Sequence, residues 1–113
     1  MSNAIRLDIV ENYATLIFDQ PNSKANVLST PFWQELGAQL DTLKTRTDLG
    51  GLLLRSAKPD IFIAGADLKE LANAEVTNPA PTRAYVELGL RVLTQLEQLP
   101  FATVAVIDGA AVG

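Results

Sequence analysis

The sequence contains no cysteine and no histidine, and each absence excludes a class of chemistry. Without cysteine, the chain has no disulfides and no thiolate nucleophile, and most kinds of zinc site are excluded. Without histidine, it has no Ser-His-Asp triad and no side chain of the type that usually acts as general base near neutral pH. Any catalytic contribution from this segment must therefore come from carboxylates, lysines or backbone dipoles.

Long apolar runs and concentrated positive charge are also missing. No stretch reaches the roughly 18 apolar residues of a membrane span. The first residues (MSNA) lack the basic and apolar regions of a secretory signal, so we expect a cytoplasmic protein without a membrane span. The net charge is −4 and the basic residues are scattered, which argues against nucleic acid as a partner. A local group of N–H donors could still bind an anionic cofactor.

The 113 residues, 48% hydrophobic and 19% charged, are typical of one globular domain or a piece of one. Alternation over residues 5–10, followed by an apolar segment at 13–19, predicts two strands joined by a turn at Glu11-Asn12. Residues 20–26 (QPNSKAN) are rich in turn-forming types and predict a loop. An antiparallel hairpin followed by a loop is therefore expected at the start of the chain.

A helix is predicted to begin at Ser29-Thr30-Pro31, where a capping hydroxyl precedes a proline in the first turn. Asp48 and the glycines at 50–51 are expected to end it. Residues 52–54 are three leucines, which suits a short strand buried on both faces. The apolar stripe of the helix consists of Phe32, Leu36, Leu40 and Leu43.

A second helix is predicted from Thr82 onward, and Pro100 is expected to close it. Residues 103–107 (TVAVI) predict another short buried strand. Strands that alternate with helices imply a mostly parallel sheet with flanking helices, so the fold class is α/β. The apolar residues at helical spacing in the second helix are Tyr85, Leu88, Val92, Leu96 and Leu99.

Residues 62–70 (FIAGADLKE) are the segment in which a backbone N–H group could act as a hydrogen-bond donor to a ligand. Gly65 permits backbone conformations closed to other residues, and the Ala66 N–H would lie at the positive end of a helix that starts at Asp67. One such donor to an oxygen that gains negative charge is worth about 3–4 kcal/mol of barrier. The alternative interpretation is structural, with Asp67 and Glu70 as a capping-box pair and Gly65 as a tight turn.

A second glycine-marked segment, residues 108–113 (DGAAVG), also follows a predicted strand and has small residues where a helix is expected to begin. Two such strand ends can offer two N–H donors to one oxygen, as in an oxyanion hole. The alternative is that glycine and alanine simply allow close packing of a helix on a strand.

Three ordered segments connect these features to a known family: 19–29 (DQPNSKANVLS), 51–71 (GLLLRSAKPDIFIAGADLKEL) and 103–113 (TVAVIDGAAVG). Together they resemble the N-terminal part of the enoyl-CoA hydratase/isomerase (crotonase) superfamily. The first two are similar to the hydratase domain of multifunctional fatty-acid oxidation enzymes. The resemblance implies the N-terminal portion of a crotonase-like ββα-repeat fold, with residues 1–113 as an incomplete domain.

The resemblance also implies roles for individual residues. The Ala66 N–H matches the first oxyanion-hole donor, and the second donor would lie just beyond Gly113. Lys69 and Lys24 are implied contacts to coenzyme A phosphates, and the alternative for each lysine is a solvated surface charge. Asn26 is expected to fix its loop. Positions implied to line the wall that faces the adenine part of coenzyme A are Ala25, Ala64, Asp67, Leu68 and Lys69.

The acidic residues that serve hydratases as general acid and base are not matched in this chain, so its own enzymatic activity is left open. The resemblance implies that the intact protein acts on an acyl-CoA, adding water to a 2-enoyl-CoA or shifting its double bond. Coenzyme A would enter as part of the substrate, with no covalent cofactor and no metal. Homo-oligomers, trimers or paired trimers, are expected by analogy. The alternatives are an inactive, truncated CoA-binding or oligomerisation module and a plain structural α/β domain.

Overall fold

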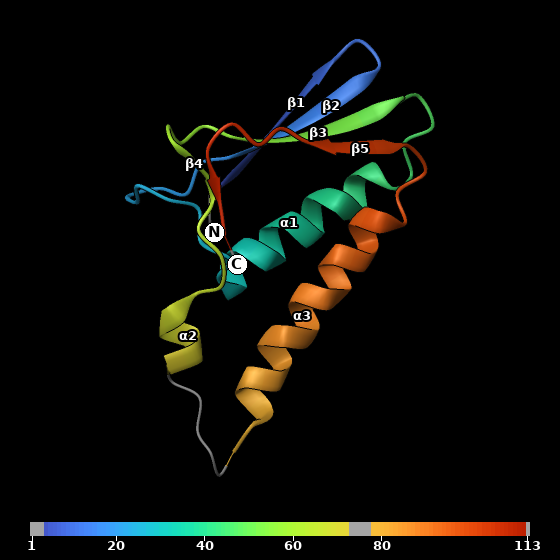
Figure 1. Ribbon diagram of the computed structural model, residues 1–113. Helices are drawn as coiled ribbons and strands as arrows, with labels where there is room; N and C mark the ends of the chain where they lie inside the picture. The colour runs from blue at the N-terminus through green and yellow to red at the C-terminus, as the bar shows by residue number, and fades with distance from the viewer. Residues whose placement is uncertain (1–3, 73–77, 113) are drawn as a thin grey trace.

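The computed structural model describes residues 4–72 and 78–112 (Figure 1). The hairpin, both long helices and the strand between them are found where the sequence predicts them. In chain order the elements are β1 (Ile5–Val10), β2 (Tyr13–Phe18), α1 (Thr30–Leu43), β3 (Gly51–Ser56), β4 (Ile61–Ile63), α2 (Leu68–Ala72), α3 (Ala80–Glu97), β5 (Ala102–Ala105) and β6 (Ala110–Ala111).

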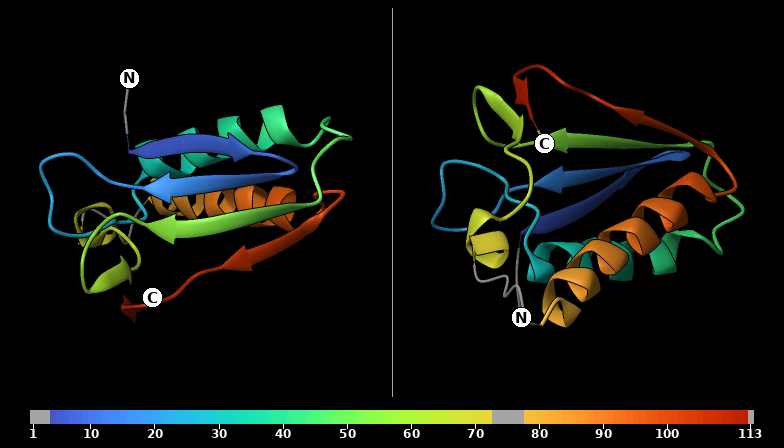
Figure 2. Two further views of the ribbon diagram at one scale, coloured as in Figure 1. Left: turned by 90° about the horizontal axis from the view of Figure 1, so that it is seen from above. Right: turned by 60° about the horizontal axis from the view of Figure 1, so that its bottom comes forward.

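The larger sheet has the strand order β1-β2-β3-β5. β1 and β2 pair antiparallel through the turn at Glu11, whose φ is 54°. β2 with β3 and β3 with β5 are parallel pairs, so that Leu16 lies opposite Leu54 and Leu54 opposite Ala105. The predicted α/β fold class, with a mostly parallel sheet, is therefore confirmed. β4 and β6 form a separate parallel pair beside its end (Figure 2).

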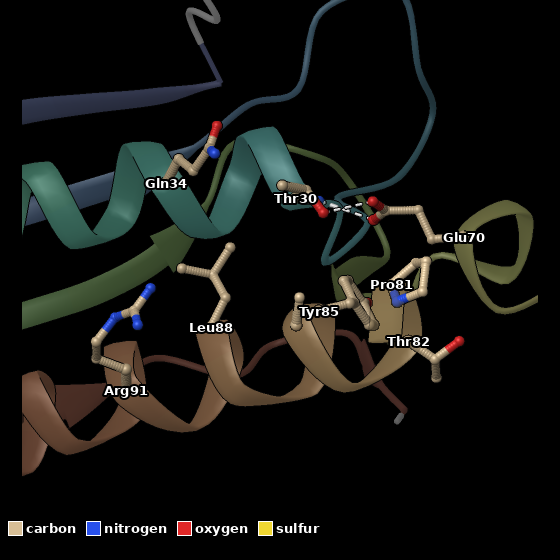
Figure 3. Close-up of a pocket in the computed structure, with 9 residues that line it drawn as sticks. Thr30, Gln34, Glu70, Pro81, Thr82, Tyr85, Leu88 and Arg91 are labelled. Carbon is tan, nitrogen blue, oxygen red and sulfur yellow. Dashed lines mark hydrogen bonds between the residues drawn. The ribbon is translucent and has the colours of Figure 1, made fainter. Parts of the chain in front are cut away.

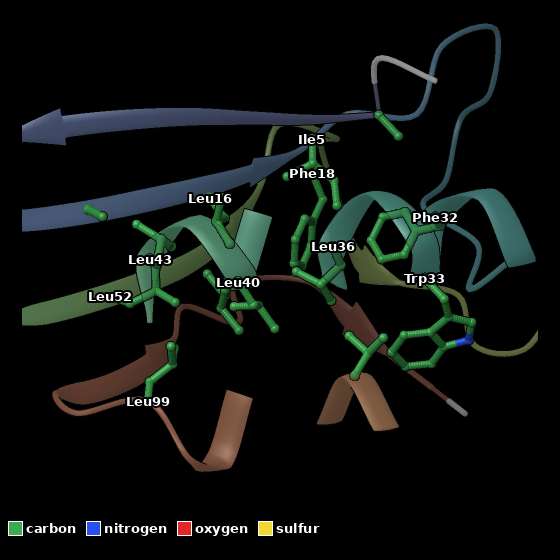
Figure 4. Close-up of a cluster of buried hydrophobic side chains, with 14 of the residues drawn as sticks. Ile5, Leu16, Phe18, Phe32, Trp33, Leu36, Leu40, Leu43, Leu52 and Leu99 are labelled. Carbon is green, nitrogen blue, oxygen red and sulfur yellow. The ribbon is translucent and has the colours of Figure 1, made fainter. Parts of the chain in front are cut away.

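Helices α1 and α3 lie on one face of the larger sheet, and the core fills the space between the helices and the sheet (Figures 2 and 4). The predicted stripe of α1 is confirmed, because its four apolar residues are all buried. Alternate residues of the two central strands meet this stripe, and burying each large side chain contributes roughly 1.5–3 kcal/mol. The strand residues concerned are Ala14, Leu16, Phe18, Leu52 and Leu54.

Two side chains cap the N-terminus of α1. Ser29 Oγ accepts a hydrogen bond from Phe32 N–H at 3.2 Å, as the capping pattern predicts. The Glu70 carboxylate of α2 accepts from Thr30 N–H at 2.8 Å and from the Thr30 hydroxyl. The helix ends at Leu43, earlier than predicted. The turn that follows is closed by its own backbone hydrogen bond, from Arg46 N–H to Leu43 C=O at 3.0 Å.

Three predictions about the strands were wrong in part. Leu53 is only half-buried, because only one face of β3 is covered by helices. β5 is an edge strand exposed along its whole length, with Val104 52% exposed. Residues 110–111 form β6 and not the start of a helix. Gly109 explains this pairing, because a Cβ there would lie 2.5 Å from the Asp60 carbonyl carbon.

Candidate functional site

The turn at residues 64–67 is held against residues 26–28 by backbone hydrogen bonds. Ala64 N–H donates to Asn26 C=O at 2.8 Å, and Leu28 N–H donates to Gly65 C=O at 2.8 Å. Gly65 has a φ of 100°, a conformation that side chains rarely allow. The predicted need for glycine at this turn is therefore confirmed.

The direction of the Ala66 N–H follows from these bonds. The described residues contain no cis peptide, and in a trans peptide the C=O and the following N–H point to opposite sides. Because Gly65 C=O points to Leu28, the Ala66 N–H points away from the 26–28 segment. Among residues 4–72 and 78–112 it finds no hydrogen-bond acceptor.

Ala66 borders an open depression of about 410 Å³. Of the residues predicted to contact coenzyme A, four share this wall with Ala66, whereas Ala25 and Lys24 lie outside it on the neighbouring loop. Lys24, Leu68 and Lys69 are exposed, and Leu68 is 77% exposed. The residues that line the depression are Val27, Ala64, Ala66, Asp67, Leu68, Lys69 and Leu71.

Asp67 caps the short helix α2 but does not form a capping box with Glu70. Its carboxylate accepts from Lys69 N–H at 2.9 Å, as an N-cap does. Glu70 does not return to Asp67 N–H, because its carboxylate binds Thr30 instead (Figure 3). Asp67 N–H donates to the Tyr85 hydroxyl at 3.1 Å. The capping-box interpretation was therefore wrong in its second half.

Asn26 is the fully buried polar residue beneath this turn, with 0% exposure. Its Oδ1 accepts from Gln20 N–H at 3.1 Å. Its Nδ2 donates to Ser56 Oγ at 2.8 Å and to Phe62 C=O at 3.0 Å. The side chain thus joins the 20–26 loop to the end of β3 and the middle of β4, which confirms its predicted loop-fixing role.

Lys58 holds the neighbouring loop, and no local sequence pattern indicates this role. Its side chain is 11% exposed, and its Nζ lies 2.9 Å from Asp19 Oδ1. The same Nζ donates to the carbonyl oxygens of Gln20 at 2.6 Å and Ser23 at 2.7 Å. These contacts stabilise the conformation of the loop that carries Ala25. No sequence period marks it, since its partners lie 35 or more residues away.

The two glycine-marked segments lie side by side. Ala110 N–H donates to Asp60 C=O at 3.0 Å, and Val112 N–H donates to Ile63 C=O at 3.1 Å. β6 therefore leads its chain to the same edge from which Ala64–Ala66 emerge. β6 reaches this edge as a strand, and the N–H groups of Ala110 and Val112 are used in its pairing with the β4 segment.

Charged groups of the described residues give no sign of a metal centre. No group of three or more acidic side chains there could hold a metal ion.

An exposed ion pair lies after the end of α1, where the hydrogen bond from Arg46 lowers the pKa of Asp48 to about 2. Within the described helices, none is long and apolar enough to cross a membrane.

Comparison with known proteins agrees with this geometry. The chain is 39% identical over 104 residues to the fatty acid oxidation complex subunit alpha of Aliivibrio fischeri, covering 91% of this chain. It spans 15–16% of the length of the curated relatives it matches. The structure is similar to enoyl-CoA hydratase from Bacillus anthracis, with a TM-score of 0.83, 28% identity and coverage of 95% of this chain and 40% of that one.

A second solved structure, an enoyl-CoA hydratase/carnithine racemase from Magnetospirillum magneticum, gives a TM-score of 0.82 at 25% identity. The match covers 93% of this chain and 39% of that chain. The profile described as "Enoyl-CoA hydratase/isomerase" matches residues 9–113. The chain belongs to the enoyl-CoA hydratase/isomerase family.

Proposed function

We propose that this chain supplies the first oxyanion-hole donor, the Ala66 N–H, to an enzyme that acts on acyl-CoA thioesters. The observation that carries the proposal is the fixed Gly65–Ala66 peptide. Its C=O is held by Leu28, and its N–H is left without an acceptor among the described residues. The relatives named as fatty acid oxidation and enoyl-CoA hydratase proteins support the substrate class.

The chemistry required of this donor is electrostatic. When water adds to the β-carbon of a 2-enoyl-CoA, electron density moves to the thioester oxygen, which becomes enolate-like. A backbone N–H fixed beforehand stabilises that oxygen more than the neutral carbonyl, by about 3–4 kcal/mol for one donor. A second donor would come from the chain that continues beyond β6, which runs parallel to β4. No side chain of this segment is assigned an acid or base role.

Coenzyme A would lie along the adjoining wall, with its adenine part against Ala25 and Ala64 and its carbonyl end at Ala66. Asp67, Leu68 and Lys69 extend that wall. Lys24 and Lys69 are exposed and could meet phosphates, a contribution that solvent keeps small. Lys58 and Asn26 support the site from behind, through the 20–26 loop. A cytoplasmic, homo-oligomeric enzyme is part of the same proposal.

The second candidate is an inactive CoA-binding or oligomerisation module. The observation in its favour is an exposed apolar row on α3, where Val86, Leu90 and Leu93 are 48%, 60% and 49% exposed. Such a row is suited to packing against another protein surface. Turnover of a 2-enoyl-CoA by the full-length protein distinguishes the two candidates, because a module of this kind binds coenzyme A without turnover.

The donor itself is tested by replacing Ala66 with L-lactic acid in the full-length protein, which exchanges the N–H for an ester oxygen and keeps the methyl group. We expect kcat for crotonyl-CoA to fall about 10²–10³-fold. The matched control is the same replacement at Ala38, an exposed residue within α1. A kcat at position 66 equal to that of the Ala38 control would refute the proposed donor.

A further inference from the structure

Tyr85 is placed within the backbone ladder that holds the Ala66 turn. The segments 26–28 and 64–67 are joined by two direct backbone hydrogen bonds, and a third would be expected between Asp67 N–H and Leu28 C=O. The tyrosine hydroxyl takes that place. It accepts from Asp67 N–H at 3.1 Å and donates to Leu28 C=O.

This insertion fixes both peptide planes that flank Ala66. The Gly65–Ala66 plane is held through Gly65 C=O, and the Ala66–Asp67 plane is held through Asp67 N–H. Only two backbone torsions, both at Ala66, separate these planes. With the hydroxyl present, the direction of the Ala66 N–H is therefore determined from both sides. Without it, Asp67 N–H keeps only its direct approach to Leu28 C=O, which does not meet the geometry of a full hydrogen bond, so the second plane is held less firmly.

The hydroxyl is supported by a long helix and by the core. Tyr85 belongs to the 18-residue helix α3 and packs against the core, so its ring is held in place. Figure 3 shows it on the face of α3 turned toward Thr30 and Glu70, where it lines a pocket of about 550 Å³. Periodicity alone assigns this residue to an apolar stripe and does not reveal the use of its hydroxyl.

We propose that Tyr85 is a positioning residue, whose hydroxyl bridges Asp67 N–H and Leu28 C=O and so holds the Ala66 N–H in the direction required by the thioester oxygen. The inference rests on the proposed function of the Ala66 amide. Since a donor misplaced by about 1 Å can cost roughly 10²-fold in rate, a single hydroxyl at this place has a measurable effect on turnover.

The test compares the full-length wild-type protein with Tyr85→Phe and the matched control Tyr13→Phe, which removes the hydroxyl of an exposed tyrosine at the start of β2. For Tyr85→Phe we expect kcat for crotonyl-CoA to fall roughly 10–100-fold while KM changes less than about threefold. The control should match the wild type in both constants.

The second measurement is the infrared carbonyl frequency of bound butyryl-CoA labelled with ¹³C at the thioester carbon. This frequency reports only folded, ligand-bound molecules, so a loss of stability in the variant does not affect it. We expect binding to the wild type to lower the frequency, and Tyr85→Phe to lose half or more of that change.

The outcomes separate the two proposals. A full frequency change in Tyr85→Phe overturns the role of Tyr85, whether or not kcat falls, and leaves the Ala66 donor in place. A kcat within about threefold of the wild type overturns it as well. If the wild type itself produces no frequency change, the proposed function fails, and the role of Tyr85 fails with it.

Discussion

Replacing Asn26 with alanine should loosen the two loops of the candidate site together. The substitution removes three hydrogen bonds from a side chain that is 0% exposed. Each contributes about 1 kcal/mol net, so the local loss is about 3 kcal/mol. That is a large fraction of the roughly 5–15 kcal/mol that stabilises a typical domain.

Hydrogen–deuterium exchange of the full-length protein measures this loss where it occurs. A change of 1.4 kcal/mol is tenfold in an equilibrium constant, so about 3 kcal/mol should speed amide exchange roughly 100-fold. The faster exchange should appear in peptides that cover residues 19–28 and 61–67. Peptides from β1, which Asn26 does not contact, should change far less.

Asn22→Gly is the matched control, because it removes an exposed amide from the same loop at a φ of 58°, which glycine adopts readily. It should leave the exchange of both peptides within about threefold of the wild type. If Asn26→Ala behaves like this control, the buried amide does not hold the loops together and the reasoning is refuted.

Two further changes test the supports of the site. Lys58→Met keeps the apolar stem but removes the ammonium group that binds Gln20 and Ser23 carbonyls, so coenzyme A should bind roughly 3–10-fold more weakly in calorimetric titration. Lys44→Met, at an exposed lysine, should bind as the wild type does, and equal affinities for the two variants would contradict the role of Lys58. Gly109→Ala places a methyl group against the Asp60 carbonyl and should separate β6 from β4 at a cost of about 1–3 kcal/mol, seen as faster exchange at residues 61–63. Gly51→Ala, where the nearest atom would lie at 3.5 Å, is the control that should leave this exchange unchanged.

The sequence predicts those parts of the fold whose signal is local. The stripe of α1 repeats at helical spacing, and its Ser29 cap lies beside the first turn, so both are visible without a structure. The same is true of the turn at Gly65, where a glycine separates apolar residues from an N-capping aspartate. In each case the residues that determine the conformation are neighbours in the chain.

The parts that could not be predicted depend on distant partners. β4 and β6 have three and two residues, too few for a periodic pattern, and their pairing joins segments almost fifty residues apart. β-branched residues in β5 indicated burial, but its outer edge has no neighbouring strand among the described residues. The contacts of Glu70 with Thr30 span 40 residues and likewise have no local signal.

A different set of distant contacts meets at residues 26–28, and this has consequences for the kinetics of the proposed site. Residues 26–28 hold the Ala66 turn through backbone bonds, while the Asn26 side chain holds the loop that carries Ala25. Under the proposed function, Lys58 supports only the coenzyme A loop and Tyr85 only the donor. Loss of the first should therefore raise KM, loss of the second should lower kcat, and loss of Asn26 should do both. A site built from independent loops would not give this third result, because no single residue would then connect binding to the chemical step.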